Sequence, residues 1–201
     1  MADSHGNNEL LLNAIRTLKG HGAGGLIHLG DMCDSGSPHL IRQVLDILRD
    51  HRVKCVRGNN ECNILHNSRD ESAARARQGP LAYLQGLPYT IVLGDLWFAH
   101  SAPLSYPAAT RRPVSEFLPL FMKDRAFAFS ILFRGHSHRP SILEIRGHTT
   151  EKIPVQPGVD IPLDRRGRYI VTVGAVEAAS SVLFLPREYA VRFVAVPRHH
   201  A

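Results

Sequence analysis

The sequence predicts one α/β domain over residues 1–201. Two observations predict this class. Short apolar runs typical of buried strands alternate with segments of helical period as far as residue 134, and residues from 141 onward have only strand and turn patterns. No repeat, linker or low-complexity tract divides the chain, and 44% apolar residues in a chain of 201 can form a substantial core.

The first helix and strands are predicted in order along the chain. A helix is predicted over residues 7–19, where leucine and isoleucine recur on one face and Gly20 follows. A second helix is predicted to begin at Ser37-Pro38, because serine is a good cap and proline suits the first turn. Buried strands are predicted at residues 24–29, 53–57 and 130–134, and a hairpin over 89–100 that turns at Gly94-Asp95.

The remaining segments are less regular. Residues 68–86 are predicted to be helical in part, with a break at Gly79-Pro80. Residues 102–114 hold three prolines and are predicted to be a loop, and residues 115–127 are predicted to be a helix that Pro119 disturbs.

Seven side chains of metal-ligand type lie in five short motifs. They are Asp3, His5, Asp31, Asn59, His100, His136 and His138. Four of the motifs follow predicted strands, and in α/β sheets the side chains at strand ends meet along one edge. Carboxylate, amide and imidazole ligands suit Mn²⁺, Fe or Zn²⁺ better than Ca²⁺ or Mg²⁺. Two such ions can share a carboxylate and a hydroxide nucleophile, so the set predicts a phosphoester hydrolase with two divalent metal ions.

In this order, the five motifs resemble those of the calcineurin-like metallophosphoesterase superfamily, over nearly the whole chain. The matching segments are Asp3-Ser4-His5, Gly30-Asp31-Met32-Cys33-Asp34, Gly58-Asn59-Asn60-Glu61, His100 and Gly135-His136-Ser137-His138. The resemblance implies an α/β/β/α sandwich of two sheets. It implies that Asp3, His5 and His138 hold one metal ion and that Asn59, His100 and His136 hold the other, with Asp31 bridging the two ions. It also implies that Asp34 and Glu61 orient these ligands.

The size of the chain and the stretch that follows His100 are most similar to the compact phosphodiesterase branch of this superfamily. Asn60 stands where the serine/threonine phosphatases have a histidine that protonates the leaving group, and an asparagine cannot act as an acid at neutral pH. We therefore predict a phosphodiesterase rather than a monoesterase, acting on a small diester or a nucleotide. The predicted catalytic residues are Asp31, Asn59, Asn60 and His100. Asn60 and Arg139 are weaker candidates for binding the substrate phosphate.

One departure from the family concerns the first motif. Members of the family carry a buried strand before it, whereas only Met1 and Ala2 precede Asp3 here. We predict that the first central strand is missing or truncated, or that the true start lies upstream. Asp3 and His5 are then expected on a frayed terminus, with a weaker metal site.

The charge and the cysteine content indicate which binding partners and which cellular compartment suit the chain. The formal charge is +6, but the basic residues are scattered, so nucleic acid is a possible partner that the pattern does not favour. No apolar run is long enough for a membrane helix and no signal peptide is visible, and three cysteines without zinc-finger spacing fit the reducing cytoplasm. The alternatives left open are a non-enzymatic interaction scaffold on the same fold and a nuclease.

Overall fold

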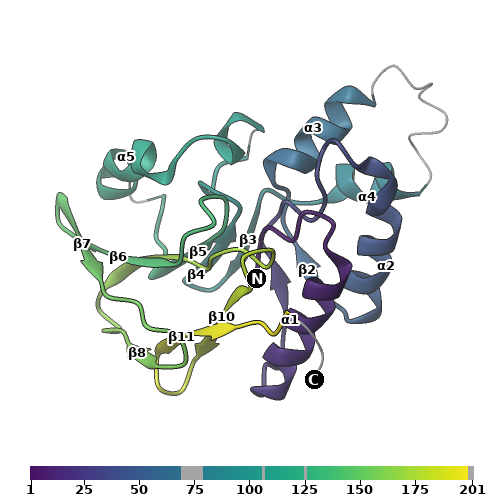
Figure 1. The fold of residues 1–201 in the computed structure, drawn as a ribbon. Coiled ribbons are helices and arrows are strands. Elements are labelled where there is room, and N and C mark those ends of the chain that lie inside the picture. Colours follow the sequence, from purple (N-terminus) through teal and green to yellow (C-terminus); the bar gives the residue numbers. More distant parts are fainter. Residues whose placement is uncertain (69–78, 106, 125, 199–201) are drawn as a thin grey trace.

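The computed structural model describes residues 1–68, 79–105, 107–124 and 126–198, and it has four layers (Figure 1). One outer layer contains the helices α1 (Asn8–Gly20), α2 (Ile41–Asp50), α3 (Asn59–Asn67) and α4 (Pro80–Gly86). The other outer layer contains α5 (Leu118–Lys123). The strands lie between these layers, as the resemblance to a sandwich implied.

A six-stranded sheet lies next to α5. Its order is β3 (Thr90–Leu93), β4 (Leu96–Ala99), β5 (Ile131–Arg134), β9 (Arg168–Thr172), β6 (Ser141–Arg146) and β7 (Thr149–Ile153). Strands β4, β5 and β9 run parallel, and the other neighbours are antiparallel. The carboxyl ends of β4 and β5 therefore lie on the same side of the sheet, where His100 and His136 follow them.

The second sheet is divided into two pieces. One piece is the parallel pair β1 (Ile27–His28) and β2 (Lys54–Cys55). The other piece has the order β10 (Ser180–Leu185), β11 (Ala190–Ala195) and β8 (Asp160–Pro162).

The first three residues lie at the division between these pieces. Residues 1–6 form no strand, as the sequence predicted, but their backbone is bonded on both sides. The amide of Leu29 donates to the carbonyl of Met1 (2.9 Å), and the amide of Val176 donates to the carbonyl of Ala2 (2.8 Å). Asp3 is fully buried, so the expectation of a frayed terminus is wrong.

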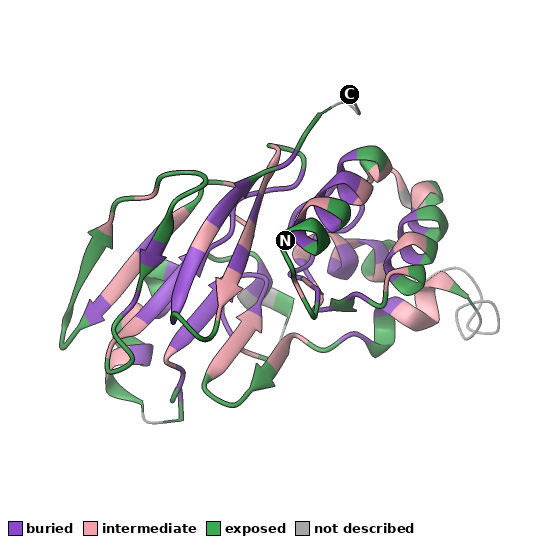
Figure 2. Cartoon of the chain, turned by 90° about the horizontal axis from the view of Figure 1, so that it is seen from below, coloured by how far each residue is buried: buried purple, intermediate pink, exposed green. Residues whose placement is uncertain are grey.

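Three hydrophobic clusters hold the layers together (Figure 2). The first joins α1 and α2 to the divided sheet through residues such as Leu11, Ile15 and Val44. The second lies between the two sheets, and the third packs Phe121 of α5 onto the outer face of the six-stranded sheet. Strands β5 and β9 are thus covered on their two faces, which explains their nearly continuous apolar sequences.

Most predicted elements are confirmed, with local differences at helix starts. Asn7 caps α1 by accepting a hydrogen bond from the amide of Leu10 (3.0 Å). Ser37 does not cap α2, because a 3₁₀ turn over Pro38–Leu40 precedes that helix and Leu40 occupies its N-cap. The prediction for residues 68–86 lies partly outside the described residues, since the structure describes 79–86 but not 69–78.

Two further differences concern helices. Helix α3, which begins at the motif residue Asn59, was not predicted. In the region 115–127, Pro119 lies in the first turn of α5, and a 3₁₀ turn at Val114–Phe117 precedes that helix. Among the described residues, no helix has the length and apolar character needed to cross a membrane.

Candidate metal centre

All seven predicted ligand residues come together at one edge of the molecule, in two adjoining clusters. One cluster is formed by Asp3, His5 and His138, whose ligand atoms lie within 4.8 Å of one another. The same limit holds for Asp3, Asp31 and His100, so the two buried carboxylates connect the clusters.

The backbone at these positions is unusual. Five of the seven candidate ligand residues have a positive φ between 48° and 70°. They are Asp3, His5, Asp31, His136 and His138. A left-handed conformation costs a residue with a side chain roughly 1–2 kcal/mol, and such strain gathers at functional sites. Here it lets the chain turn sharply just after each extended segment and direct these side chains to one place.

The first cluster joins two imidazoles and a carboxylate. Nε2 of His5 lies 3.3 Å from Nε2 of His138, which in turn lies 3.4 Å from Oδ1 of Asp3. That oxygen is buried without a hydrogen-bond partner among the described residues. The contact with Asp3 raises the pKa of His138. Burial acts to raise the pKa of Asp3, but the contact with His138 and the other nearby donors outweigh it and lower that pKa.

The second cluster joins two imidazoles and an amide. Oδ1 of Asn59 lies 2.9 Å from Nε2 of His100 and 3.0 Å from Nδ1 of His136, and these two nitrogens are 3.2 Å apart. Oδ2 of Asp31 is 3.5 Å from Nε2 of His100. Burial lowers the pKa of His136, which favours the neutral ring that a metal ion requires.

The other nitrogen of each imidazole contacts an oxygen that can only accept a hydrogen bond. The pairs are His5 Nδ1 with Asp34 (2.6 Å), His138 Nδ1 with Glu177 (2.9 Å), His100 Nδ1 with the carbonyl of Leu29 (2.8 Å), and His136 Nε2 with the carbonyl of Arg111 (3.1 Å). These nitrogens must carry the proton, so the nitrogens that face one another inside each cluster are unprotonated when the rings are neutral.

This arrangement fits divalent metal ions. Within each cluster, nitrogen and oxygen atoms with lone pairs lie 2.9–3.4 Å apart. When the rings are neutral, no proton lies between these atoms to form a hydrogen bond. These lone pairs repel one another, and a cation between them would be coordinated by them instead. A metal-binding histidine usually donates the proton of its outer nitrogen to an oxygen, as these four imidazoles do. The absence of thiolates from both clusters of described residues favours a catalytic site over a structural zinc site.

Glu61 holds two of the motif loops together from behind. It is fully buried, and its carboxylate accepts hydrogen bonds from the amides of Asp31 (2.9 Å), Met32 (2.8 Å) and Gly58 (2.7 Å). Burial and the nearby charge of Asp31 raise the pKa of Glu61 to about 7, while the amide donors oppose this rise. Glu61 therefore holds together the loops that carry Asp31 and Asn59.

Asn60 is bonded to Asp31. Its backbone amide and its Nδ2 donate to the two oxygens of Asp31 (2.8 and 2.9 Å), and its Oδ1 accepts from the amide of Ser35 (3.1 Å). In this conformation the side chain orients a candidate ligand. Arg139 is exposed and follows His138 directly.

Two glycines allow the close approach of these loops. A Cβ atom at Gly58 would lie 2.2 Å from Oδ1 of Asp31, and one at Gly135 would lie 2.6 Å from Oδ2 of Asp3. Both distances are far below van der Waals contact. The glycine before each of these ligand motifs is thus required by the limited space around the two carboxylates.

The sequence analysis missed two contributors. Glu177 approaches both His138 (2.9 Å) and His5 (4.0 Å), but it lies on a loop after β9, outside every motif. His28 is fully buried, and its Nε2 donates to Oγ of Ser4 (3.1 Å), which itself donates to the carbonyl of Met32. The place of His28 in a predicted strand, three residues before Asp31, was a signal that it faces the first motif. No comparable signal marked Glu177.

Comparison with known proteins shows a family likeness over most of the chain. The family model of the calcineurin-like phosphoesterase superfamily domain matches residues 1–178. No curated protein matched the sequence.

Three solved structures show the same fold. A metallophosphoesterase from Sphaerobacter thermophilus has a TM-score of 0.71 at 24% identity, with 99% of this chain and 87% of that chain covered. For the protein TT1561 of Thermus thermophilus the TM-score is 0.53 at 10% identity, with 98% and 97% covered. For a protein proposed to be a diadenosine tetraphosphatase the TM-score is 0.56 at 16% identity, with 98% and 92% covered.

Proposed function

The chain belongs to the calcineurin-like phosphoesterase superfamily, and we propose that it is a phosphodiesterase that uses two divalent metal ions. The observation that carries this proposal is the pair of clusters in which unprotonated imidazole nitrogens face other lone pairs. We propose that Asp3, His5 and His138 hold one ion, that Asn59, His100 and His136 hold the other, and that Asp31 is shared. When bound, two such ions would activate water as a nucleophile and neutralise charge on the phosphoryl oxygens. The nitrogen and oxygen donors of these residues are compatible with Mn²⁺, Fe or Zn²⁺.

The residues of the chain that surround these ligands set the geometry. Glu61 and Asn60 fix Asp31 through backbone and side-chain hydrogen bonds. Asp34, Glu177 and two backbone carbonyls keep the four imidazoles in the tautomers that direct a lone pair inward. Such fixed orientation keeps the reacting groups aligned without reorganisation during the reaction.

Two observations favour a diester over a monoester. Asn60 has no acidic proton to give to a leaving group, so groups that depart as stable anions should react best. The carboxylates of Asp34 and Glu177 are partly exposed beside the first cluster, with relative exposures of 54% and 39%. They repel the doubly charged phosphate of a monoester more than the singly charged phosphate of a diester.

The test compares two substrates with added Mn²⁺: bis-p-nitrophenyl phosphate, a diester, and p-nitrophenyl phosphate, a monoester. We expect turnover of the diester to exceed that of the monoester, and His136→Ala to lower diester turnover at least about 100-fold. His148→Ala is the matched control, because His148 is exposed in the β6–β7 turn, away from the ligand motifs. A diadenosine polyphosphate should be included as a nucleotide substrate, since one structural neighbour is proposed to be a diadenosine tetraphosphatase.

The outcomes distinguish the alternatives. Faster monoester turnover would contradict the proposed preference for diesters and the role of the carboxylates beside the first cluster, whereas the leaving group, and so the role of Asn60, is the same in both compounds. If neither compound is hydrolysed by protein that contains both metal ions, an interaction scaffold on the same fold is the better explanation. Cleavage of DNA or RNA in preference to both compounds would instead favour a nuclease.

A further inference from the structure

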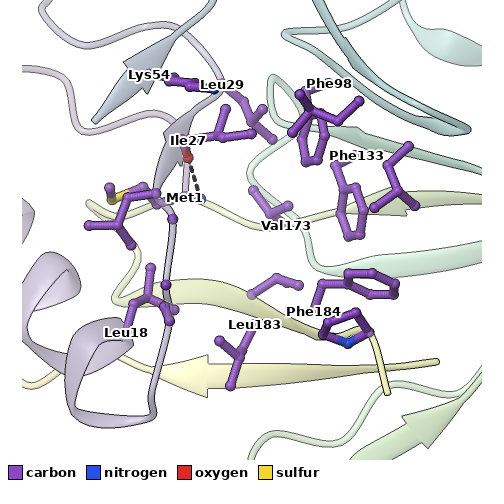
Figure 3. Close-up of a pocket in the computed structure, with 18 of the residues that line it drawn as sticks. Met1, Leu18, Ile27, Leu29, Lys54, Phe98, Phe133, Val173, Leu183 and Phe184 are labelled. Atoms are coloured by element: carbon purple, nitrogen blue, oxygen red, sulfur yellow. Dashed lines mark hydrogen bonds between the residues drawn. The ribbon is translucent and has the colours of Figure 1, made fainter. Parts of the chain in front are cut away.

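A large apolar cavity lies at the division in the second sheet, and none of the seven candidate ligands lines it (Figure 3). Its volume is about 740 Å³, and most of its lining side chains are apolar, such as Leu18, Phe98 and Phe133. A phosphate in this cavity would not contact the candidate ligands. The phosphate of a substrate must therefore be bound at the metal centre itself, where a cationic side chain beside the clusters can contact its oxygens.

Several arginines near the ligand motifs are engaged in other contacts. The guanidinium of Arg57 donates to the hydroxyl of Tyr89 (3.1 Å) and lies over the ring of that residue. Arg112 forms an ion pair with Glu116. Arg134 is buried at the end of β5. These three side chains are therefore directed away from a phosphate at the metal centre.

Arg111 spans the second cluster from the loop to helix α3. Its backbone carbonyl contacts Nε2 of His136 (3.1 Å), and its guanidinium donates to Oδ1 of Asn63. Asn63 follows Asn59 by four residues in α3, so these two side chains are neighbours on one face of the helix, with Cβ atoms about 5–6 Å apart. The guanidinium of Arg111 therefore lies close to two candidate ligands of the second cluster.

The guanidinium of Arg111 can accept an anionic partner. Arg111 is exposed, and its contact with Asn63 leaves N–H donors of the guanidinium fork for other acceptors. The first cluster has the carboxylates of Asp34 and Glu177 beside it, whereas the second cluster has this cation. The charge beside the metal centre is thus negative at one end and positive at the other.

We propose that Arg111 is a substrate-binding residue whose guanidinium donates to the non-bridging oxygens of the substrate phosphate from the side of α3. This inference rests on the proposed function, in which the two metal ions hold that phosphate. Asn63 keeps the guanidinium in place, and a guanidinium fork matches the spacing of two phosphate oxygens. The anionic oxygens of the phosphate then face Arg111, on the side away from Asp34 and Glu177.

The test compares the wild type, Arg111→Ala, Arg111→Lys and Arg112→Ala with bis-p-nitrophenyl phosphate and Mn²⁺. We expect Arg111→Ala to raise KM at least about 10-fold with a smaller change in kcat, because a charge-assisted hydrogen bond to the phosphate is lost. Arg111→Lys should lie between Arg111→Ala and the wild type, since lysine keeps the charge but not the fork. Arg112→Ala is the matched control and should leave KM unchanged, because the side chain of Arg112 pairs with Glu116.

Two further measurements separate phosphate binding from turnover and from support of the metal ions. Calorimetric titration of the Mn²⁺-loaded protein with inorganic phosphate should give a dissociation constant at least about 10-fold higher for Arg111→Ala than for Arg112→Ala. The Mn²⁺ content of Arg111→Ala should equal that of the wild type, because alanine keeps the backbone carbonyl that contacts His136.

Equal KM and equal phosphate affinity for Arg111→Ala and Arg112→Ala would overturn the proposal. A loss of Mn²⁺ from Arg111→Ala that matches its loss of turnover would overturn it too, because Arg111 would then support the metal ions rather than bind the phosphate. Phosphate binding that requires Arg111 in a protein without hydrolytic activity would support the inference and contradict the proposed function, so the two failures are distinguishable.

Discussion

At the scale of single residues, the candidate metal centre depends on which nitrogen of each imidazole carries the proton. Asp34, Glu177 and two carbonyls take the outer protons, and this leaves inward lone pairs on His5, His138, His100 and His136. The groups that accept these protons therefore set the direction of the lone pairs on the candidate ligands.

Glu177→Gln tests this orienting role. We expect metal affinity at the cluster of His5 and His138 to fall about 10-fold, while the cluster of His100 and His136 keeps its affinity. The measurement is a competition titration of the metal-free protein with a chromophoric chelator. Glu188→Gln is the control, since Glu188 is exposed in the turn between β10 and β11. An unchanged affinity at both clusters would show that Glu177 does not support His138.

His28 provides a pH-dependent prediction. Burial lowers its pKa from 6.5 to about 3, so the folded chain keeps this ring neutral where the unfolded chain protonates it. Between these two values the unfolded chain binds more protons, and the free energy of unfolding therefore decreases as the pH falls.

In His28→Gln this contribution should disappear, because an amide can keep a bond to Ser4 but does not titrate. When the pH falls from 7 to 4, we expect the free energy of unfolding of the wild type to decrease by roughly 3 kcal/mol more than that of the variant. Denaturant unfolding at a series of pH values measures this difference. A difference that stays constant with pH would contradict the assignment of a buried neutral ring.

At the scale of elements, the site depends on loops that pack unusually closely. The amino end of α3, with Gly58 as its N-cap, lies against Asp31, and the Asn60 amide donates to the Asp31 carboxylate. This placement puts a negative charge at the positive end of a helix dipole.

Gly58→Ala should disturb this packing. A Cβ there would lie 2.5 Å from the amide nitrogen of Asp31, so the loops must move apart. We expect a loss of about 1–3 kcal/mol in the free energy of unfolding, together with weaker metal binding. Gly36→Ala is the control, because a Cβ at Gly36 would meet nothing within 4 Å. Equal stability of the two variants would contradict the close packing described.

The elements that the sequence predicted well are those with a clear hydrophobic period. Helix α1 and the hairpin of β3 and β4 had such a pattern and a clear turn or cap. Helix α3 did not, because it has few apolar residues and its first turn is occupied by motif side chains. A glycine followed three residues later by Glu61 is nevertheless a cap signal, and it was available in the sequence.

At the scale of the whole molecule, the meeting of the seven candidate ligand residues was predictable because each lies in a motif, and most follow a strand. The support from Glu177 and from the carbonyl of Arg111 was not predictable, since both depend on loops that meet only in the folded chain. The two-sided bonding of Met1 and Ala2 likewise depends on distant segments, β1 and the loop after β9. Contacts between such distant segments produce no pattern in the sequence around each residue.

The most direct test of the account is the number of divalent ions bound per chain. Metal-free protein titrated with Mn²⁺ is predicted to bind two ions, His136→Ala is predicted to bind one, and the control His148→Ala is predicted to bind two. The account would be contradicted if the wild-type chain bound no Mn²⁺, or if His136→Ala still bound two ions with unchanged affinity.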